Sequence, residues 1–287
     1  MSSTTSSERA RLHVGAAATL VAAGAALAML GRAVAASGPL VATGWWATAA
    51  GVAWLLLAPP TVATLRDSVL PGAFLALSLG LAGYALGEGE VVALAAFLVV
   101  PLAIGPAVAG LIRRTMPTPF HLVGFAAGAL AIVAAGASGG DDPAIVLAAA
   151  SGGALTVVHL AMARTIHRHR VIAHGGGVLV VAGALLLAGA IATESALPTG
   201  GAWLPLVGAA ILGGIALPLV RIRLAQRLTP GGIRPHLPLL AAGAVLVEGL
   251  PDDALGFVTV ALIVLGAWTA GLRPSELTGA EAFRSGP

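Results

Sequence analysis

The chain has 287 residues, of which 58% are apolar and only 9% are charged. A soluble domain carries about 25% charged residues, so this composition excludes a soluble enzyme and a nucleic-acid-binding domain and predicts a polytopic membrane protein. The net charge is +3, and every cation is an arginine because the chain has no lysine. The absence of cysteine excludes disulfides, thiol catalysis and iron–sulfur ligation.

Long apolar segments follow one another along the chain and predict an all-α bundle of about ten transmembrane helices. A helix needs roughly 20 apolar residues to cross the hydrocarbon core, and these segments are continuously apolar rather than alternating, which disfavours a membrane barrel. Residues 1–12 and 273–287 are expected as cytoplasmic tails of a helical domain at 13–272. The predicted spans are 13–30, 40–58, 69–86, 91–112, 120–136, 145–163, 171–192, 203–220, 236–250 and 254–271.

The first span also has the pattern of a signal peptide. Arg9 and Arg11 precede an apolar run that ends near a possible cleavage site at Ala33-Val34-Ala35. The run is longer than the apolar core of a usual signal peptide, so we expect an uncleaved first helix.

The arginines predict the orientation of the bundle. Cytoplasmic loops are enriched in arginine and lysine. If the connectors alternate between the two sides, only Arg32 falls on the side away from the N-terminus, where the other loops are acidic. Both termini are therefore expected in the cytoplasm, with the protein in the cell membrane. The arginines on the N-terminal side are Arg9, Arg11, Arg66, Arg113, Arg114, Arg164, Arg168, Arg170, Arg221, Arg223, Arg227, Arg234, Arg273 and Arg284.

Pro101 predicts a kink in the fourth span, because proline removes a backbone hydrogen bond and clashes with the preceding turn. Pro106 follows in the same span, and the bent helix is a candidate for a cavity wall or a gate. Paired glycines near the centres of two other spans indicate either tight helix contacts or flexible points that line a cavity. These pairs are Gly152 with Gly153 and Gly213 with Gly214.

Two histidines on consecutive predicted helices are candidate ligands. His159 lies five residues before Arg164, and His174 lies four residues after Arg170, so both are expected roughly 6–8 Å below these arginines. Two imidazoles at matched depth could hold a haem iron or another transition metal, and glycines 175–177 would let a flat ligand approach. The simpler interpretation is that both histidines lie at the membrane interface and that the protein has no cofactor.

No charged residue lies near the centre of a predicted span, where it would be expected to be functional. Glu248 comes closest, a few residues from an outer loop, as an interfacial carboxylate or as an uptake group for a proton or cation. The lack of a central carboxylate lowers the expectation of ion-coupled transport but leaves facilitated transport open.

The overall plan, with about ten helices, both termini inside and short loops, resembles the drug/metabolite transporter group. This resemblance covers the whole chain in helix count and length, and no functional residue carries over from it. The composition, rich in alanine, glycine and valine with acidic outer turns, also resembles uncharacterised polytopic membrane proteins of haloarchaea.

Three functions stay open on these observations. The first is transport of a small neutral or weakly polar solute, the second a non-catalytic membrane subunit or assembly partner, and the third a haem or metal redox role through His159 and His174. An enzyme is not favoured, because the chain has no lysine for a phosphate loop. The expected partners are the bilayer and the anionic lipid head groups beside the arginine-rich loops.

Overall fold

The computed structural model describes residues 6–87, 143–165, 168–193 and 197–216, with scattered helical positions between 122 and 133 and between 254 and 265. Within this part of the chain every regular element is helical, which confirms the all-α class there. In chain order the elements are α1 (Ser6–Ser37), α2 (Pro39–Leu57), α3 (Val62–Gly87), α6 (Pro143–Thr165), α7 (Val171–Thr193), the 3-10 turn η2 (Gly200–Ala202), α8 (Trp203–Ala209) and the π-helix η3 (Ala210–Ala216).

Helices of membrane-spanning length account for several of the predicted spans. Four of the described helices are long and apolar enough to cross a membrane. They coincide with the first, second, third and seventh predicted spans, and α1 extends beyond its apolar part to Ser6. The four apolar stretches are Leu12–Ser37, Pro39–Leu57, Val62–Leu86 and Val171–Thr193.

The other predicted spans are covered unequally. Shorter apolar helices at Val146–Met162 and Gly200–Ala216 correspond to the sixth and eighth spans. The fourth and ninth spans, 91–112 and 236–250, lie outside the described residues, and the fifth and tenth are represented only by scattered helical positions. The number of ten spans therefore stays a prediction.

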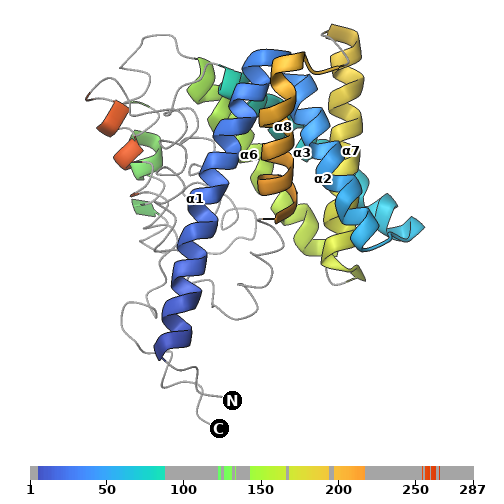
Figure 1. The fold of residues 1–287 in the computed structure, drawn as a ribbon, viewed down its shortest axis with the longest axis horizontal. Coiled ribbons are helices and arrows are strands. Elements are labelled where there is room, and N and C mark those ends of the chain that lie inside the picture. Colours follow the sequence, from blue (N-terminus) through green and yellow to red (C-terminus); the bar gives the residue numbers. More distant parts are fainter. Residues whose placement is uncertain are drawn as a thin grey trace.

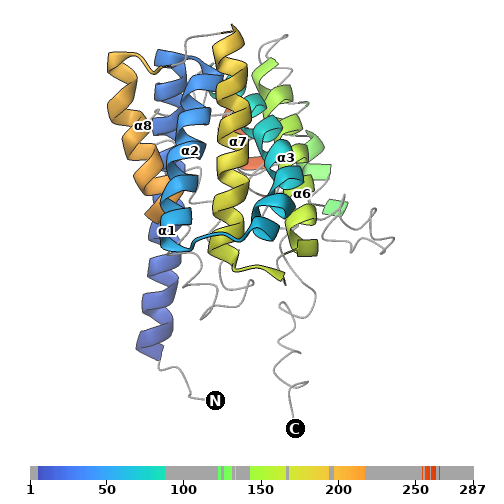
Figure 2. The same cartoon turned by 90° about the vertical axis from the view of Figure 1, so that its right-hand side faces the viewer.

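The described helices form a row in the order α8, α2, α7, α3 and α6, with α1 packed along α2, α3 and α8 (Figure 2). The connections from α2 to α3 and from α6 to α7 lie at the same end of the bundle, measured along the helix axes, and α1 begins toward that end (Figure 1). Two connections far apart in the sequence are thereby brought together around the start of α3 and the start of α7.

Glycine and proline set the tight turn between α1 and α2. Gly38 has a φ of 92°, a conformation that residues with a Cβ rarely adopt. Its N–H donates to the Val34 carbonyl at 2.8 Å, and its own carbonyl accepts from Ala42 at 3.2 Å. Pro39 then occupies the first turn of α2, where its fixed φ suits a helix start. The turn reverses the chain and lays α2 against α1.

Glycines at a spacing of seven residues bring α2 and α7 into close contact. Gly44 and Gly51 lie on α2. Gly176 and Gly183 face them on the antiparallel α7. A Cβ placed at Gly51 would lie only 2.7 Å from the backbone nitrogen of Val180. We call these four glycines the glycine seam. Small residues of this kind allow helices in lipid to approach closely.

The segment that matches a signal-peptide cleavage site belongs to the core. Ala33 and Val34 are buried together with Leu86 and Leu206. Removal of α1 would therefore expose apolar surface on α3 and α8. The uncleaved first helix stays a prediction, and this packing supports it.

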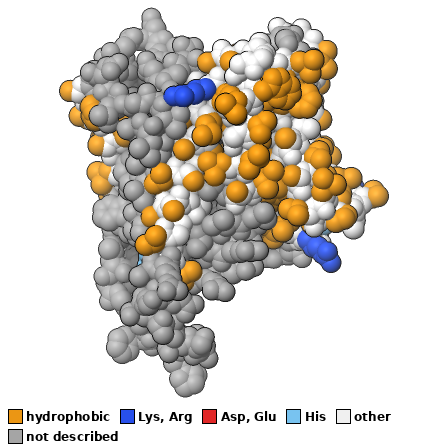
Figure 3. Space-filling view, viewed as in Figure 1, with side chains coloured by type: hydrophobic (Ala, Val, Ile, Leu, Met, Phe, Trp, Pro, Cys, Tyr) orange, Lys and Arg blue, Asp and Glu red, His pale blue; other side chains and the backbone are white. Residues whose placement is uncertain are grey.

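Large apolar side chains also cover the outside of the described helices. Leu56, Leu70, Ile191 and Leu204 are among the exposed ones. Figure 3 shows hydrophobic side chains spread over the described part of one face, with arginines only toward its upper and lower ends. Extensive exposed apolar surface marks a contact with lipid or protein. This distribution of side chains is compatible with a membrane protein.

Candidate functional site

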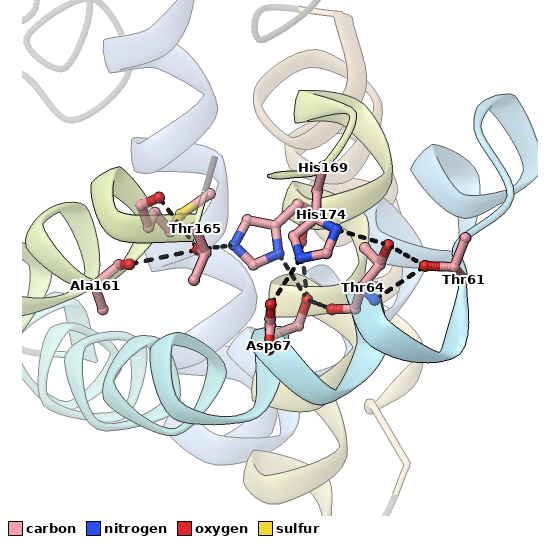
Figure 4. A network of polar contacts seen from close by, with 9 residues as sticks. Thr61, Thr64, Asp67, Ala161, Thr165, His169 and His174 are labelled. Atoms are coloured by element: carbon pink, nitrogen blue, oxygen red, sulfur yellow. Dashed lines mark hydrogen bonds and ion pairs between the residues drawn. The ribbon is translucent and has the colours of Figure 1, made fainter. Parts of the chain in front are cut away.

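A network of buried polar side chains lies where the two connections meet (Figure 4). It draws on the first two turns of α3, the last turn of α6, the α6–α7 connection and the first turn of α7. We call this group the histidine cluster. Its members are Thr64, Asp67, Ser68, Thr165, His169 and His174.

The start of α3 positions three members of the histidine cluster. The Thr61 carbonyl accepts the first helical hydrogen bond, from Leu65 at 3.1 Å. The Thr61 hydroxyl accepts from the Thr64 N–H at 3.1 Å, which is the usual bond of a helix cap. Thr64, Asp67 and Ser68 then follow at positions that share one helix face.

His174 is fully buried in the first turn of α7, and both of its ring nitrogens are bonded to hydroxyls. Nδ1 lies 3.0 Å from the Ser68 hydroxyl, and Nε2 lies 2.9 Å from the Thr165 hydroxyl. The Ser68 hydroxyl donates to the Thr64 carbonyl at 2.7 Å, so it accepts from Nδ1–H. In a neutral imidazole this arrangement places the proton on Nδ1, and Nε2 accepts from Thr165.

His169 lies between α6 and α7 and links this segment to α3 by hydrogen bonds. Its Nε2 lies 2.8 Å from Asp67 Oδ2, and its Nδ1 lies 3.2 Å from the Thr64 hydroxyl. The rings of His169 and His174 are neighbours, with centroids 5.3 Å apart and planes inclined by 36°. One carboxylate and two imidazoles thus share one end of the bundle.

Exposure to solvent falls along these three groups. The side chain of Asp67 is 29% exposed, that of His169 is 7% exposed, and His174 is 0% exposed. The charges of Arg66 and Arg168 also act on Asp67. The cluster therefore begins at a charged surface and leads into the apolar interior.

Other side chains of the protein occupy the space beside the glycines that follow His174. A Cβ at Gly177 would lie 2.6 Å from the Ser68 hydroxyl, and one at Gly175 would lie 3.0 Å from the ring of Trp54. In the described residues, side chains of the protein thus lie where the flat ligand was expected beside glycines 175–177. Gly177 instead allows Ser68 to reach His174.

The predicted pairing of His159 with His174 is not seen in the described residues. His159 lies on α6, but its side chain is outside the described residues. The imidazole found beside His174 is that of His169, and a metal bound to His174 would have to displace Ser68 or Thr165. Within the described residues no three His, Cys, Asp or Glu side chains form a metal site. The haem role stays a prediction.

The first pair of candidate glycines has two different environments on α6. Gly152 is buried, and its carbonyl accepts from the Thr156 hydroxyl at 3.0 Å. Gly153 is exposed, and a Cβ there would meet nothing within 4 Å. A tight helix contact therefore does not explain Gly153.

The second pair, Gly213 and Gly214, lies in the π-helix η3. Two indole N–H groups of α2 donate to backbone carbonyls of η3 and of the last residue of α8. Trp54 donates to the Gly214 carbonyl at 2.9 Å, and Trp46 donates to the Ala209 carbonyl at 3.1 Å. A Cβ at Gly214 would lie 2.7 Å from a side chain of α2. Both a close contact and an irregular helix are thus present at this pair.

The remaining candidates, Pro101, Pro106 and Glu248, lie outside the described residues. Sequence reasoning missed Asp67, Ser68 and His169. The available signal was the run Thr64-x-x-Asp67-Ser68, which places three polar side chains on one face of an otherwise apolar helix.

No protein-family model matches the chain, and no curated protein matches it. Among solved structures, a crystal structure of a protein with 19% sequence identity superposes with a TM-score of 0.55. The superposition covers 93% of this chain and 98% of the other. At this level of identity the likeness shows a shared fold alone.

Proposed function

We propose that the protein resides in the cell membrane and moves a small, neutral or weakly polar solute across the bilayer. The histidine cluster closes the cytoplasmic end of the path. The observation that carries this proposal is the placement of a part-exposed carboxylate and two imidazoles, one of them fully buried, at the junction of α3, α6 and α7. Ionisable side chains inside a membrane domain are costly and mark substrate or ion paths.

The chemistry of the junction suits a closure that opens and shuts. At this end α3 is joined to α7 and to the α6–α7 connection by hydrogen bonds of Asp67 and Ser68. Each such bond contributes about 0.5–1.5 kcal/mol net. Farther along, α3 is packed on α7 through Gly72, where a Cβ would lie 2.6 Å from the side chain of Val181. A close apolar contact of this kind is a fixed point about which the hydrogen-bonded end can separate.

The π-helix supports the same proposal. Single turns of π-helix inside longer helices occur frequently at functional sites, and transporters often bind their substrates beside interrupted helices. η3 follows α8 directly at the end of the apolar stretch Gly200–Ala216 and contacts α1 and α2.

The proposed topology has ten spans with both termini in the cytoplasm. Arg66, Arg168 and Arg170 belong to the end of the bundle that carries the histidine cluster, whereas Arg32 lies near the opposite end of α1. Arginine is enriched in cytoplasmic loops, which supports a cytoplasmic location for the cluster. Anionic lipid head groups are the expected partners of these arginines.

A second candidate is a non-catalytic membrane subunit or assembly partner. The exposed leucines and valines on the outer faces favour it, because apolar surface of this kind can bind another membrane helix as well as lipid. A third candidate is the haem role, which predicts a Soret band in the purified protein that is lost in His159→Ala and His174→Ala.

Solute entry into vesicles tests the transport proposal. The protein is reconstituted in liposomes, and shrinkage followed by re-swelling is recorded by light scattering after addition of glycerol, serine or glucose. We expect at least one solute to enter faster than into protein-free vesicles. We also expect Asp67→Asn to raise that rate, because it weakens the bond to His169.

Thr193→Ala is the matched control, since among the described residues that hydroxyl bonds to Gly189 of its own helix, at 2.9 Å, at the far end of α7. Equal rates of solute entry into protein-containing and protein-free vesicles, for all three solutes, would contradict the proposal and favour the subunit candidate.

A further inference from the structure

We infer that the histidine cluster is a proton-binding site. Asp67, His169 and His174 hold one protonic charge between them, and its uptake from water and its release couple solute transport to protons. The coupling rests on the proposed transport function, whereas proton binding does not and is measured separately.

The hydroxyls around His174 can satisfy both of its protonation states. In the neutral form Nδ1–H donates to Ser68, and Nε2 accepts from Thr165 at 2.9 Å. When Nε2 gains a proton it donates to the same Thr165 oxygen. The Thr165 hydroxyl then turns to the Met162 carbonyl at 3.2 Å or to the Ala161 carbonyl at 3.4 Å. No polar atom of the ring loses its partner, so the usual cost of an unpaired buried group does not arise.

The count of charges limits the cluster to one proton. Asp67 bonds directly to His169 at 2.8 Å, and the ring of His174 lies 5.3 Å beyond. Protonation of both imidazoles would place two like charges this close in a poorly solvated site, with only one carboxylate to offset them. The favoured state therefore carries a single positive charge, on His169 or on His174.

The charged groups around His174 agree with this count. On α3 they are Arg66 and Asp67, and α2 has no charged residue. On α6 the side chains of residues 159 and 164 lie outside the described residues. The described groups of the α6–α7 connection are Arg168, His169 and Arg170. The arginines favour proton loss from the cluster, and Asp67 opposes them as the group in direct contact.

Solvent exposure gives the proton a route. Asp67 is the most exposed of the three groups and His174 is fully buried, so a proton from water is exchanged at Asp67 and His169, and burial disfavours the charged form of His174. Only an N–H bond forms and breaks, and the proton returns to water by release. When the proton has left the cluster, His169 is neutral and its bond to Asp67 is no longer an ion pair. The link between α3 and the α6–α7 connection is then weaker, which is the state that opens the path.

Proton binding is tested on the full chain labelled with ¹⁵N-histidine in detergent micelles. The nitrogen shifts of His169 and His174, assigned through His169→Gln and His174→Gln, are followed from about pH 5 to 8, the range in which histidine charge changes. We expect the two rings to titrate together, and Asp67→Asn to lower their proton affinity about tenfold or more. Thr193→Ala should leave the titration unchanged.

Two results would overturn the proton site. One is that the nitrogens of both His169 and His174 keep the same shifts across the whole range. The other is that Asp67→Asn titrates as the wild type does. Asp67→Asn preserves the size of a partly exposed side chain, so this test does not depend on whether the buried His174→Gln variant folds.

Coupling is tested in the vesicle assay with an imposed pH gradient. We expect the gradient to change the wild-type rate of solute entry at least about twofold and to leave the His169→Gln rate unchanged. A wild-type rate that ignores the gradient overturns the coupling. Absence of all solute entry overturns the proposed function, and the nitrogen titration still decides whether the proton site exists.

Discussion

A single hydroxyl connects α3 to the buried imidazole of α7. Ser68 is fully buried, donates to the Thr64 carbonyl at 2.7 Å and accepts from His174 Nδ1–H at 3.0 Å. Gly177 makes this possible, because any side chain there would collide with Ser68. The hydrogen bond between α3 and His174 thus depends on one small residue on each helix, Ser68 on α3 and Gly177 on α7.

Ser68→Ala is expected to lower the free energy of unfolding by about 1–3 kcal/mol, because the mutation leaves the buried Nδ1–H without an acceptor. The measurement is unfolding of the detergent-purified protein by sodium dodecyl sulfate, followed by circular dichroism. Thr193→Ala, at an exposed position on the same helix as His174, serves as the control. Equal stability of Ser68→Ala and the wild type would show that this bond contributes nothing.

The histidine cluster escaped prediction for a reason found in its own residues. The third apolar run begins at residue 69, because Thr64, Arg66 and Asp67 interrupt the apolar pattern before it. In the structure the Thr61 cap starts the helix at Val62. Asp67 and Ser68 therefore lie on a helix face rather than in a connector. His169 has the composition of a solvated loop, and only the fold brings it to Asp67.

At the scale of the helix, apolar runs alone predicted the described elements well. The described parts of α2 and α7 lie within one residue of the predicted spans at both ends. Partner choice was not predictable, since the run of glycines on α7 fits either a ligand or a neighbouring helix. The structure shows the glycine seam between α2 and α7, a pairing of helices more than 100 residues apart.

Two glycine-to-alanine substitutions should therefore have opposite effects. Gly51→Ala places a Cβ 2.7 Å from the backbone of α7 and is expected to cost about 1–3 kcal/mol through overpacking. Gly153→Ala meets nothing within 4 Å and is expected to add about 0.5–1 kcal/mol, because alanine is the better helix former. Detergent unfolding measures both, and a destabilised Gly153→Ala would contradict the open environment at that position.

At the scale of the whole molecule, the likeness to a solved structure covers 93% of the chain, and every regular element among the described residues is helical. The orientation in the membrane follows only from the distribution of arginine. The absence of cysteine makes this orientation easy to test, because each introduced cysteine is the only thiol in the protein.

Single cysteines at Ser3 and at Gly201 should be labelled from opposite sides of the membrane. Gly201 lies in η2, where a side chain would meet no other atom within 4 Å, at the end of the bundle away from the histidine cluster. In intact cells a membrane-impermeant maleimide should label Gly201→Cys and leave Ser3→Cys unlabelled. Labelling of Ser3→Cys in intact cells would place the N-terminus outside and reverse the proposed topology.

The π-helix carries a consequence for how the chain tolerates changes in length. A π turn contains one residue more than an α turn, so η3 holds a surplus residue that the indole groups of Trp46 and Trp54 help to retain. Deletion of Gly213 would let the segment close into a regular α-helix. In an α-helix the same deletion would rotate the following residues by about 100°. We therefore expect η3 to absorb a one-residue deletion locally. The face that α8 turns toward α1 and α2 would then stay the same.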